Sequence, residues 1–148
     1  SGVRGPKIIE TLARTFTDIS ARLDVTDWSQ VAATVEQTVH HSAFIVIATK
    51  IPPAGMETEF TDALSRLTER HTVLVASATD PDELRARRGR ADAEEVFLAA
   101  SAALSQRADE AGAADVRLAG ALTLQASADL LPARTADRYI ELKKSGRL

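Results

Sequence analysis

The chain lacks cysteine altogether and has no long apolar run. Without cysteine it can form neither a disulfide framework nor a reactive thiol, which fits a reducing compartment and leads us to expect a cytoplasmic location. No apolar stretch approaches the ~20 residues that a membrane-spanning helix needs, and no signal peptide is visible. The sequence therefore predicts no membrane segment. Because the chain begins with Ser1-Gly2 rather than methionine, we expect it to be a processed product or a fragment of a longer protein.

Motifs of the common enzyme classes are absent as well. The sequence has no glycine-rich phosphate loop and no GxSxG elbow, and the spacing of its Ser, His and Asp residues marks no catalytic triad. The net charge of −3 gives no general attraction to nucleic acid or to an anionic membrane. The sequence therefore shows no specific catalytic signal, and we expect a non-enzymatic chain without catalytic residues, cofactors or a nucleic-acid partner.

What the chain does have is apolar residues at steps of three or four, which predict five helices. The first begins near Pro6 and carries the apolar stripe Ile8, Leu12, Phe16, Ile19 and Leu23. The others are expected at about residues 27–39, 57–70, 92–111 and 130–144. Asp27 or Thr26 is expected to cap the second helix, Gly112 to end the fourth and Gly146 to end the last.

Apolar runs between these helices predict three strands, at residues 44–49, 73–78 and, more weakly, 116–121. The first two runs are apolar without alternation, which is typical of parallel strands covered by helices on both faces. Strands that alternate with helices imply crossover connections and a parallel sheet. We therefore predict that residues 1–148 form a single α/β domain, a three-layer, Rossmann-like fold with helices on both faces of the sheet.

The strand at residues 44–49 raises the question of what lies beside it. It contains none of the charges that usually protect the exposed edge of a sheet. One interpretation is that this is an interior strand, whose second neighbour comes from further chain or from a partner. The alternative is that the two amino-terminal helices cover the edge. On the first interpretation, we expect the isolated chain to self-associate through this edge.

Four stretches in order resemble a known bacterial family. They are "ARLDVTDW" at residues 21–28, "HTVLVASATDPDEL" at 71–84, "RADAEEVFLAASAAL" at 90–104 and "ADRYIELKKSGRL" at 136–148. Together they resemble the carboxyl-terminal half of the family called domain of unknown function number fifty-eight, which has a von Willebrand factor A-like fold. Members sit beside MoxR-type AAA+ ATPases. The resemblance implies an adaptor or chaperone-like partner of such an ATPase, acting in protein complex assembly.

The resemblance also gives a meaning to the end of the first strand. The strands at 44–49, 73–78 and 116–121 would be the fourth, fifth and sixth of a von Willebrand A-like sheet. The DxSxS metal motif of its first strand is absent here. Metal-competent relatives have an acidic residue where this chain has Lys50, whereas Thr49 matches the pattern. A charged ammonium group offers no lone pair to a metal. We therefore expect a degenerate site without metal, in which Lys50 takes the place of the cation.

An alternative function is left open at the same place. Ligands of open α/β sheets bind beyond the carboxyl ends of the strands. Thr49, Lys50 and Asp80 are expected there, so the chain could be a small α/β enzyme or an anion- or nucleotide-binding domain. For Asp80, which precedes Pro81, the structural interpretation as a helix cap is favoured.

Other charged and aromatic residues have simpler structural interpretations. The cluster Arg85, Arg87, Arg88 and Arg90 is flanked by acidic residues and contains no aromatic residue to stack on a base. A solvated loop or a contact with an acidic partner is therefore favoured over a nucleic-acid site. The pair His40-His41 suits the carboxyl end of a helix, because adjacent helical residues point apart and cannot share a metal. His71 is expected to be structural, and Tyr139 to anchor the last helix to the core.

Overall fold

The computed structural model describes residues 26–86 and 93–148, and the predicted first helix and Arg87, Arg88 and Arg90 lie outside these ranges. The described elements in chain order are α2 (Trp28–Thr38), β1 (Phe44–Ala48), α3 (Thr58–Thr68), β2 (Thr72–Thr79), α4 (Pro81–Ala86), α5 (Ala93–Leu118), β3 (Leu122–Ser127) and α6 (Leu131–Lys144). In this part of the chain, strands and helices alternate as the sequence predicts, except that the short helix α4, which was not predicted, precedes α5.

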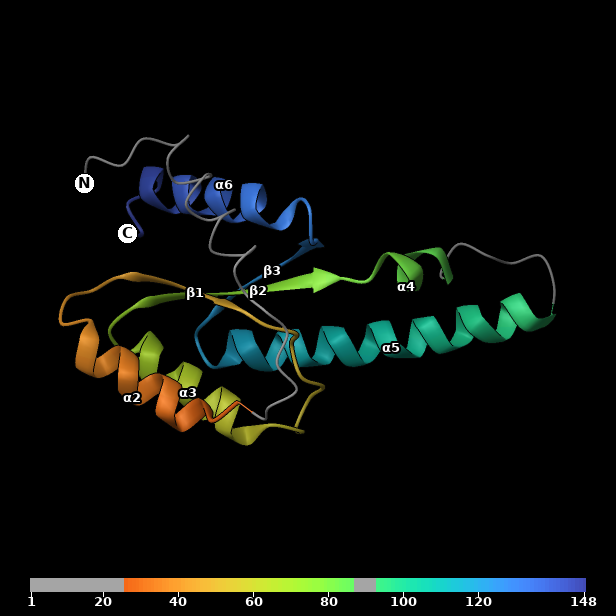
Figure 1. The fold of residues 1–148 in the computed structure, drawn as a ribbon, viewed down its shortest axis with the longest axis horizontal. Helices are drawn as coiled ribbons and strands as arrows, with labels where there is room; N and C mark the ends of the chain where they lie inside the picture. The colour runs from red at the N-terminus through yellow and green to blue at the C-terminus, as the bar shows by residue number, and fades with distance from the viewer. Residues whose placement is uncertain (1–25, 87–92) are drawn as a thin grey trace.

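The three strands form a parallel sheet in the order β1-β2-β3. Helices α2, α3 and α5 lie on one face of this sheet and α6 lies on the other (Figure 1). The two connecting helices α3 and α5 share a face, as expected when successive crossovers have the same hand. The predicted α/β class, the parallel sheet and the helices on both faces are therefore confirmed.

Two predictions about the third strand and the helix before it were wrong. Residues 116–118 belong to α5, and the strand begins only at Leu122. Gly112 does not end α5, which continues for six more residues to Leu118. The turn that follows contains Gly120, whose φ of 94° is a conformation that side-chain-bearing residues rarely adopt. The helix therefore ends one glycine later than predicted.

Gly112 has a packing role instead. A Cβ atom at this position would lie well inside van der Waals contact with the carbonyl oxygen of Pro52, and 3.2 Å from Cγ2 of Ile51. The missing side chain therefore lets α5 pass directly against the segment that follows β1. A glycine in a helix interior costs about 1 kcal/mol relative to alanine, and here that cost is offset by close packing.

The larger core lies between the sheet and the layer of α2, α3 and α5. Its fully buried members are centred on the inward face of α3 and on alternate residues of β2: Phe60, Leu64, Leu67, Val73, Val75 and Val116. The inward positions predicted for Phe60, Leu64 and Leu67 are confirmed.

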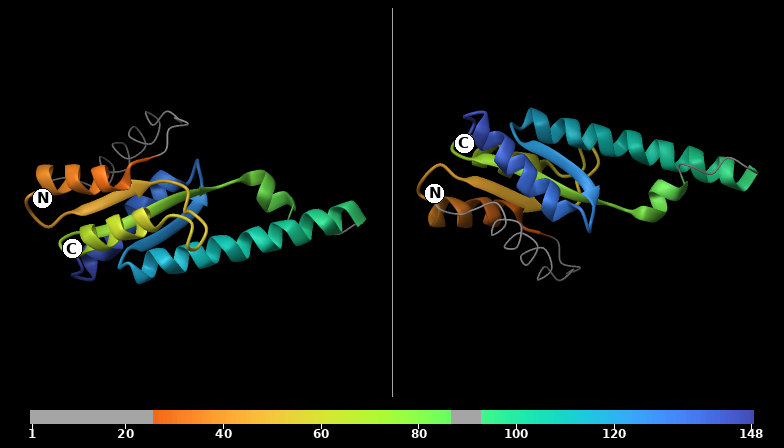
Figure 2. Two further views of the ribbon diagram at one scale, coloured as in Figure 1. Left: turned by 90° about the horizontal axis from the view of Figure 1, so that it is seen from below. Right: turned by 90° about the horizontal axis from the view of Figure 1, so that it is seen from above.

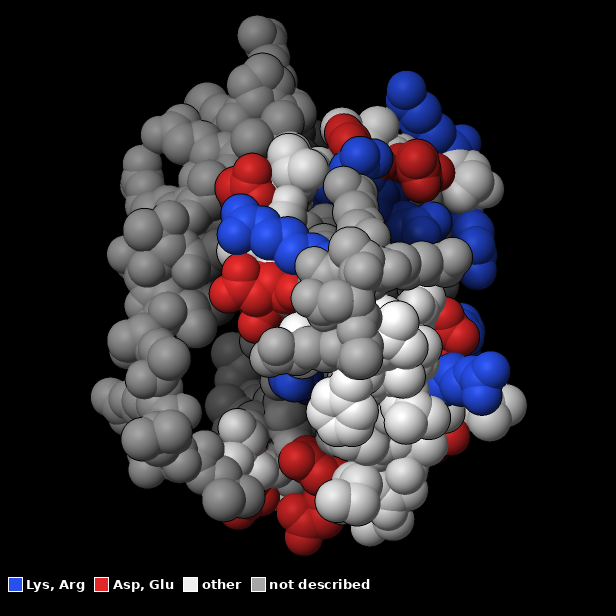
Figure 3. Space-filling model, turned by 90° about the vertical axis from the view of Figure 1, so that its right-hand side faces the viewer, with Lys and Arg blue, Asp and Glu red and all other residues white. Residues whose placement is uncertain are grey.

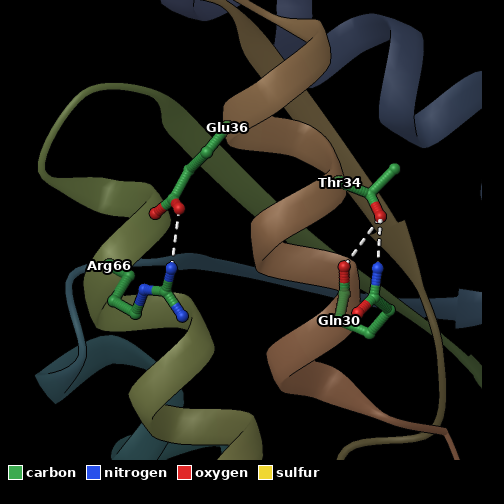
Figure 4. A network of polar contacts seen from close by, with 4 residues as sticks. All are labelled: Gln30, Thr34, Glu36 and Arg66. Carbon is green, nitrogen blue, oxygen red and sulfur yellow. Dashed lines mark hydrogen bonds and ion pairs between the residues drawn. The ribbon is translucent and has the colours of Figure 1, made fainter.

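Helix α2 is attached to α3 by both apolar and charged contacts. The side chain of Asp27 accepts a hydrogen bond from the amide of Gln30 at 2.9 Å, so the predicted cap is confirmed. The ring centroids of Trp28 and Phe60 are 4.6 Å apart. Arg66 donates to Glu36 at 2.6 Å across the two helices (Figure 4). The two helices therefore pack as a pair below β1.

Helix α6 covers the opposite face of the sheet. Leu131, Ala136 and Leu142 are buried there. The ring of Tyr139 lies 5.5 Å from that of Phe44 at the start of β1, as expected for an anchor to the core. No helix among the described residues is both long enough and apolar enough to cross a membrane.

Candidate functional site

A cavity of about 390 Å³ lies where the strands end, between the sheet and the middle of α5. The segment after β1 and the end of β2 contribute Lys50, Ile51, Ser77, Ala78, Thr79 and Asp80, β3 contributes Gln125, and α5 contributes Gln106, Asp109 and Glu110. We call it the strand-end cavity. Open parallel sheets hold their ligands beyond the carboxyl ends of their strands, so this is the expected place for a binding site.

The sheet register explains why this cavity is polar. Side chains alternate along a strand, so Ser77 and Thr79 share the face of Val73 and Val75, which pack toward α5. Gln125 is the register partner of Ser77 on β3 and shares that face. The core between sheet and helix is therefore apolar along the first half of β2 and becomes polar at its carboxyl end. The same change occurs along α5, from Ala113 and Val116 in the core to Gln106, Asp109 and Glu110 at the cavity.

Three carboxylates and one ammonium group line this cavity. Figure 3 views the molecule from the side toward which the strands run, and both acidic and basic side chains appear on it. Asp80 accepts a hydrogen bond from the amide of Asp82 at 2.8 Å and so holds the first turn of α4. Glu110 accepts one from Gln106 at 3.0 Å. In Asp80 and in Glu110 the second carboxylate oxygen accepts no hydrogen bond from a described residue. Asp109 is half-buried, and neither of its oxygens accepts a hydrogen bond from a described residue.

The structure brings two of the three residues predicted for this edge to the cavity. Lys50 and Asp80 line it. Thr49 is not among the lining residues, and its amide donates to the carbonyl oxygen of Ala76 at 3.1 Å, which continues the pairing of β1 with β2. The cap role expected for Asp80 is also present, so the structural and the functional interpretation of Asp80 are compatible.

Sequence reasoning missed the other polar residues that line the strand-end cavity. Gln125 was missed because the third strand was placed too early in the chain. Gln106, Asp109 and Glu110 were not singled out because the sequence does not show which face of a long, alanine-rich helix meets the sheet. The available signal was their spacing, since residues 106, 109 and 110 lie three and four apart and therefore share one helix face.

The remaining candidate residues lie away from the cavity. His40 and His41 are exposed just beyond α2. Arg85 is exposed on α4, 3.5 Å from Asp82. His71 is buried at the amino end of β2, where its Nδ1 accepts a hydrogen bond from the amide of Ala43 at 3.2 Å. In the part of the chain that the structure describes, no three His, Asp or Glu residues are grouped so that they could hold a metal ion.

Comparison with known proteins adds no relative: no protein-family model, no curated protein and no solved structure matches the chain.

Proposed function

We propose that the chain is a non-enzymatic protein-interaction module, built like the carboxyl-terminal half of a von Willebrand factor A domain. In this proposal it serves as an adaptor or chaperone-like partner of a MoxR-type AAA+ ATPase in protein complex assembly. The sequence resemblance supports the family, and the parallel order β1-β2-β3 agrees with the order that such a half would have. The observation that carries the proposal is the apolar edge of β1.

The backbone of β1 offers hydrogen-bonding groups along that edge. On one side, the carbonyl oxygen of Ala43 accepts from Thr72, and the amide of Thr49 donates to Ala76. Backbone groups alternate in direction along a strand, so those of Phe44, Val46 and Ala48 face away from β2. Among the described residues no strand pairs with them. Every residue of β1 is half-buried rather than fully buried, as expected of a strand that is completed by further chain or by a partner.

Lys50 gains a role in this arrangement. If a strand pairs with the open side of β1, the sheet continues on both sides of β1. Lys50, which follows the carboxyl end of β1, then lies at the point where the strand order reverses, which is where open α/β sheets bind their ligands. Its ammonium group can then pair with carboxylates at the end of the added strand, in place of the cation that metal-competent relatives hold.

The test compares proline substitutions at two neighbouring positions of β1. Val46→Pro removes an amide that faces the open edge, whereas Ile47→Pro removes one that faces β2 and so disrupts the existing sheet. We expect the unmodified chain to self-associate and to form a complex with a purified MoxR-type ATPase, both measured by light scattering. Val46→Pro should weaken both while retaining the circular dichroism of the folded chain, and Ile47→Pro should unfold it. A stable monomer over a wide concentration range that also forms no complex would refute the proposal.

A second candidate function is a small α/β enzyme or an anion- or nucleotide-binding domain, because Lys50 and Asp80 line the strand-end cavity. Calorimetric titration with ATP and with inorganic phosphate tests it. Binding that is lost in Lys50→Ala would favour this candidate. The three carboxylates that line the same cavity argue against an anionic ligand.

A further inference from the structure

The strand-end cavity differs in its polar groups from a site for phosphate or nucleotide. Its charged groups are mostly carboxylates, because Asp80, Asp109 and Glu110 line it together with the single ammonium group of Lys50. Carboxylates only accept hydrogen bonds while ionised, so the wall is rich in acceptors. A ligand that completes it must bring donors and positive charge.

Asp109 is the least exposed of these three carboxylates. It is half-buried, it lies on the part of α5 that faces the sheet, and no described residue donates to it. A carboxylate that is partly shielded from water and lacks a partner is less stable than a paired one, and a cation that enters the cavity offsets part of that cost.

Ser77 gives an independent indication on the opposite wall. Only 6% of this residue is exposed to solvent, its side chain faces α5, and no described residue forms a hydrogen bond with its hydroxyl group. Buried polar groups usually have a partner. Ser77 as a residue is nine-tenths buried and its hydroxyl group faces the cavity, so a ligand there can supply the partner that no described residue provides. Gln125 lies beside it in the sheet register and adds both a donor and an acceptor.

The shape of the ligand group follows from the distribution of these acceptors. They lie on two walls, the sheet and α5, and, within the described residues, they are not grouped so that one metal ion could be shared by three of them. A planar guanidinium group presents five N–H donors in a fixed fork and can reach acceptors on both sides, whereas an ammonium group is a compact point charge.

We propose that the strand-end cavity binds the guanidinium group of an arginine side chain presented by a protein partner. The inference that the arginine belongs to a protein partner rests on the proposed function. The preference of the cavity for a guanidinium group follows from the residues that line it. Lys50 also lines the cavity, and its ammonium group disfavours a second cation, so the cavity takes one arginine rather than a basic cluster.

The experiment uses the whole chain and two matched probes, the amide-blocked amino acids N-acetyl-arginine methylamide and N-acetyl-citrulline methylamide. Citrulline has nearly the same shape but carries no charge. We expect the arginine probe to saturate in an NMR titration, with chemical-shift changes at Ser77, Gln106 and Gln125, and the citrulline probe to bind at least tenfold more weakly. Equal binding of the two probes, or saturation by inorganic phosphate or Mg²⁺ instead, would overturn the proposal.

Two isosteric variants locate the effect. Asp109→Asn and Glu110→Gln should each weaken the arginine probe by about threefold to tenfold, and the control Glu69→Gln, an exposed acidic residue beyond α3, should not. Circular dichroism shows whether each variant is folded, and either variant suffices if the other is not. Unchanged binding in both folded variants would sink the proposal.

The outcome is separable from that of the proposed function. If the chain binds the arginine probe but forms no complex with a MoxR-type ATPase, the proposed guanidinium site is supported and the proposed ATPase partner is refuted. A chain that forms the complex but does not bind the probe refutes the cavity proposal alone.

Discussion

The amino and carboxyl ends of the sheet are built from the same strands and the same helix but differ in character. At the amino end, α5 lies on the sheet through small and branched apolar residues, and Val73, Val116 and Ala121 are almost completely buried. At the carboxyl end, the same helix is separated from the strands by a polar cavity, and its first half projects beyond the sheet (Figure 2). Val96, Phe97 and Leu104 on that half are more than half exposed.

Length explains much of this difference. A helix of 26 residues is about 39 Å long, whereas a strand of eight residues spans about 27 Å. The sheet can therefore bury only part of α5, whatever the apolar content of the remainder. Apolar residues alone do not decide burial, because a surface must also be present to cover them.

The largest effect is expected at the boundary between the two ends, where α5 passes Pro52. Gly112→Ala should destabilise the fold by about 3 kcal/mol, because the added methyl group overlaps a backbone oxygen that cannot move freely. Helix propensity acts in the opposite direction, by about 1 kcal/mol. Urea denaturation followed by circular dichroism measures the sum, with Ser105→Ala on the exposed surface as control. A raised midpoint for Gly112→Ala would show that the contact with Pro52 is not tight.

The next effect separates the buried half of α5 from the projecting half. Val116→Ala should cost about 2 kcal/mol, because it removes two methyl groups from a filled core. Leu104→Ala removes more atoms but lies on the exposed half, and should change the free energy of unfolding by less than about 0.5 kcal/mol. Equal losses, measured by the same denaturation, would mean that the projecting half is covered in solution.

A third comparison concerns buried polar groups at the two ends. His71→Leu should cost about 1 to 2 kcal/mol, because the amide of Ala43 loses its acceptor in a half-buried place. Ser77→Ala at the opposite end should be close to neutral, because no described residue depends on that hydroxyl group. Thermal unfolding of both variants checks this, and a larger loss for Ser77→Ala would show that the cavity wall depends on the hydroxyl group.

The smallest effect is expected at the loop between β3 and α6. A hydrogen bond from the Ser127 side chain, aided by backbone amides, lowers the pKa of the exposed carboxyl group of Asp129 below 3.8. Because its pKa is depressed in the folded state, this group contributes stability above pH 3.8, and the contribution is lost as the pH falls through the lowered value. Asp129→Asn should therefore slightly lower the midpoint of thermal unfolding at neutral pH, and should leave it unchanged in strong acid. A difference that persists in acid would exclude this cause.

The sequence by itself determined the local elements of the protein. Apolar spacing located α2, α3 and α6, and apolar runs located β1 and β2, because these patterns follow from the periods of helix and strand. The capping role of Asp27 and the position of Lys50 and Asp80 at the carboxyl ends of the strands also follow from local chemistry and from the parallel topology.

Only the tertiary structure decided where α5 ends and what it faces. By sequence, Gly112 and Gly120 are equivalent stop signals, and the contact with Pro52, sixty residues earlier in the chain, makes Gly112 an interior packing residue. Because α5 continues to Leu118, the third strand lies at Leu122–Ser127, and Gln125 of this strand lines the cavity. Asp109 and Ser77 likewise become neighbours of one cavity only through the rotation of α5 over the sheet, because packing between distant segments, rather than local propensity, fixes that rotation.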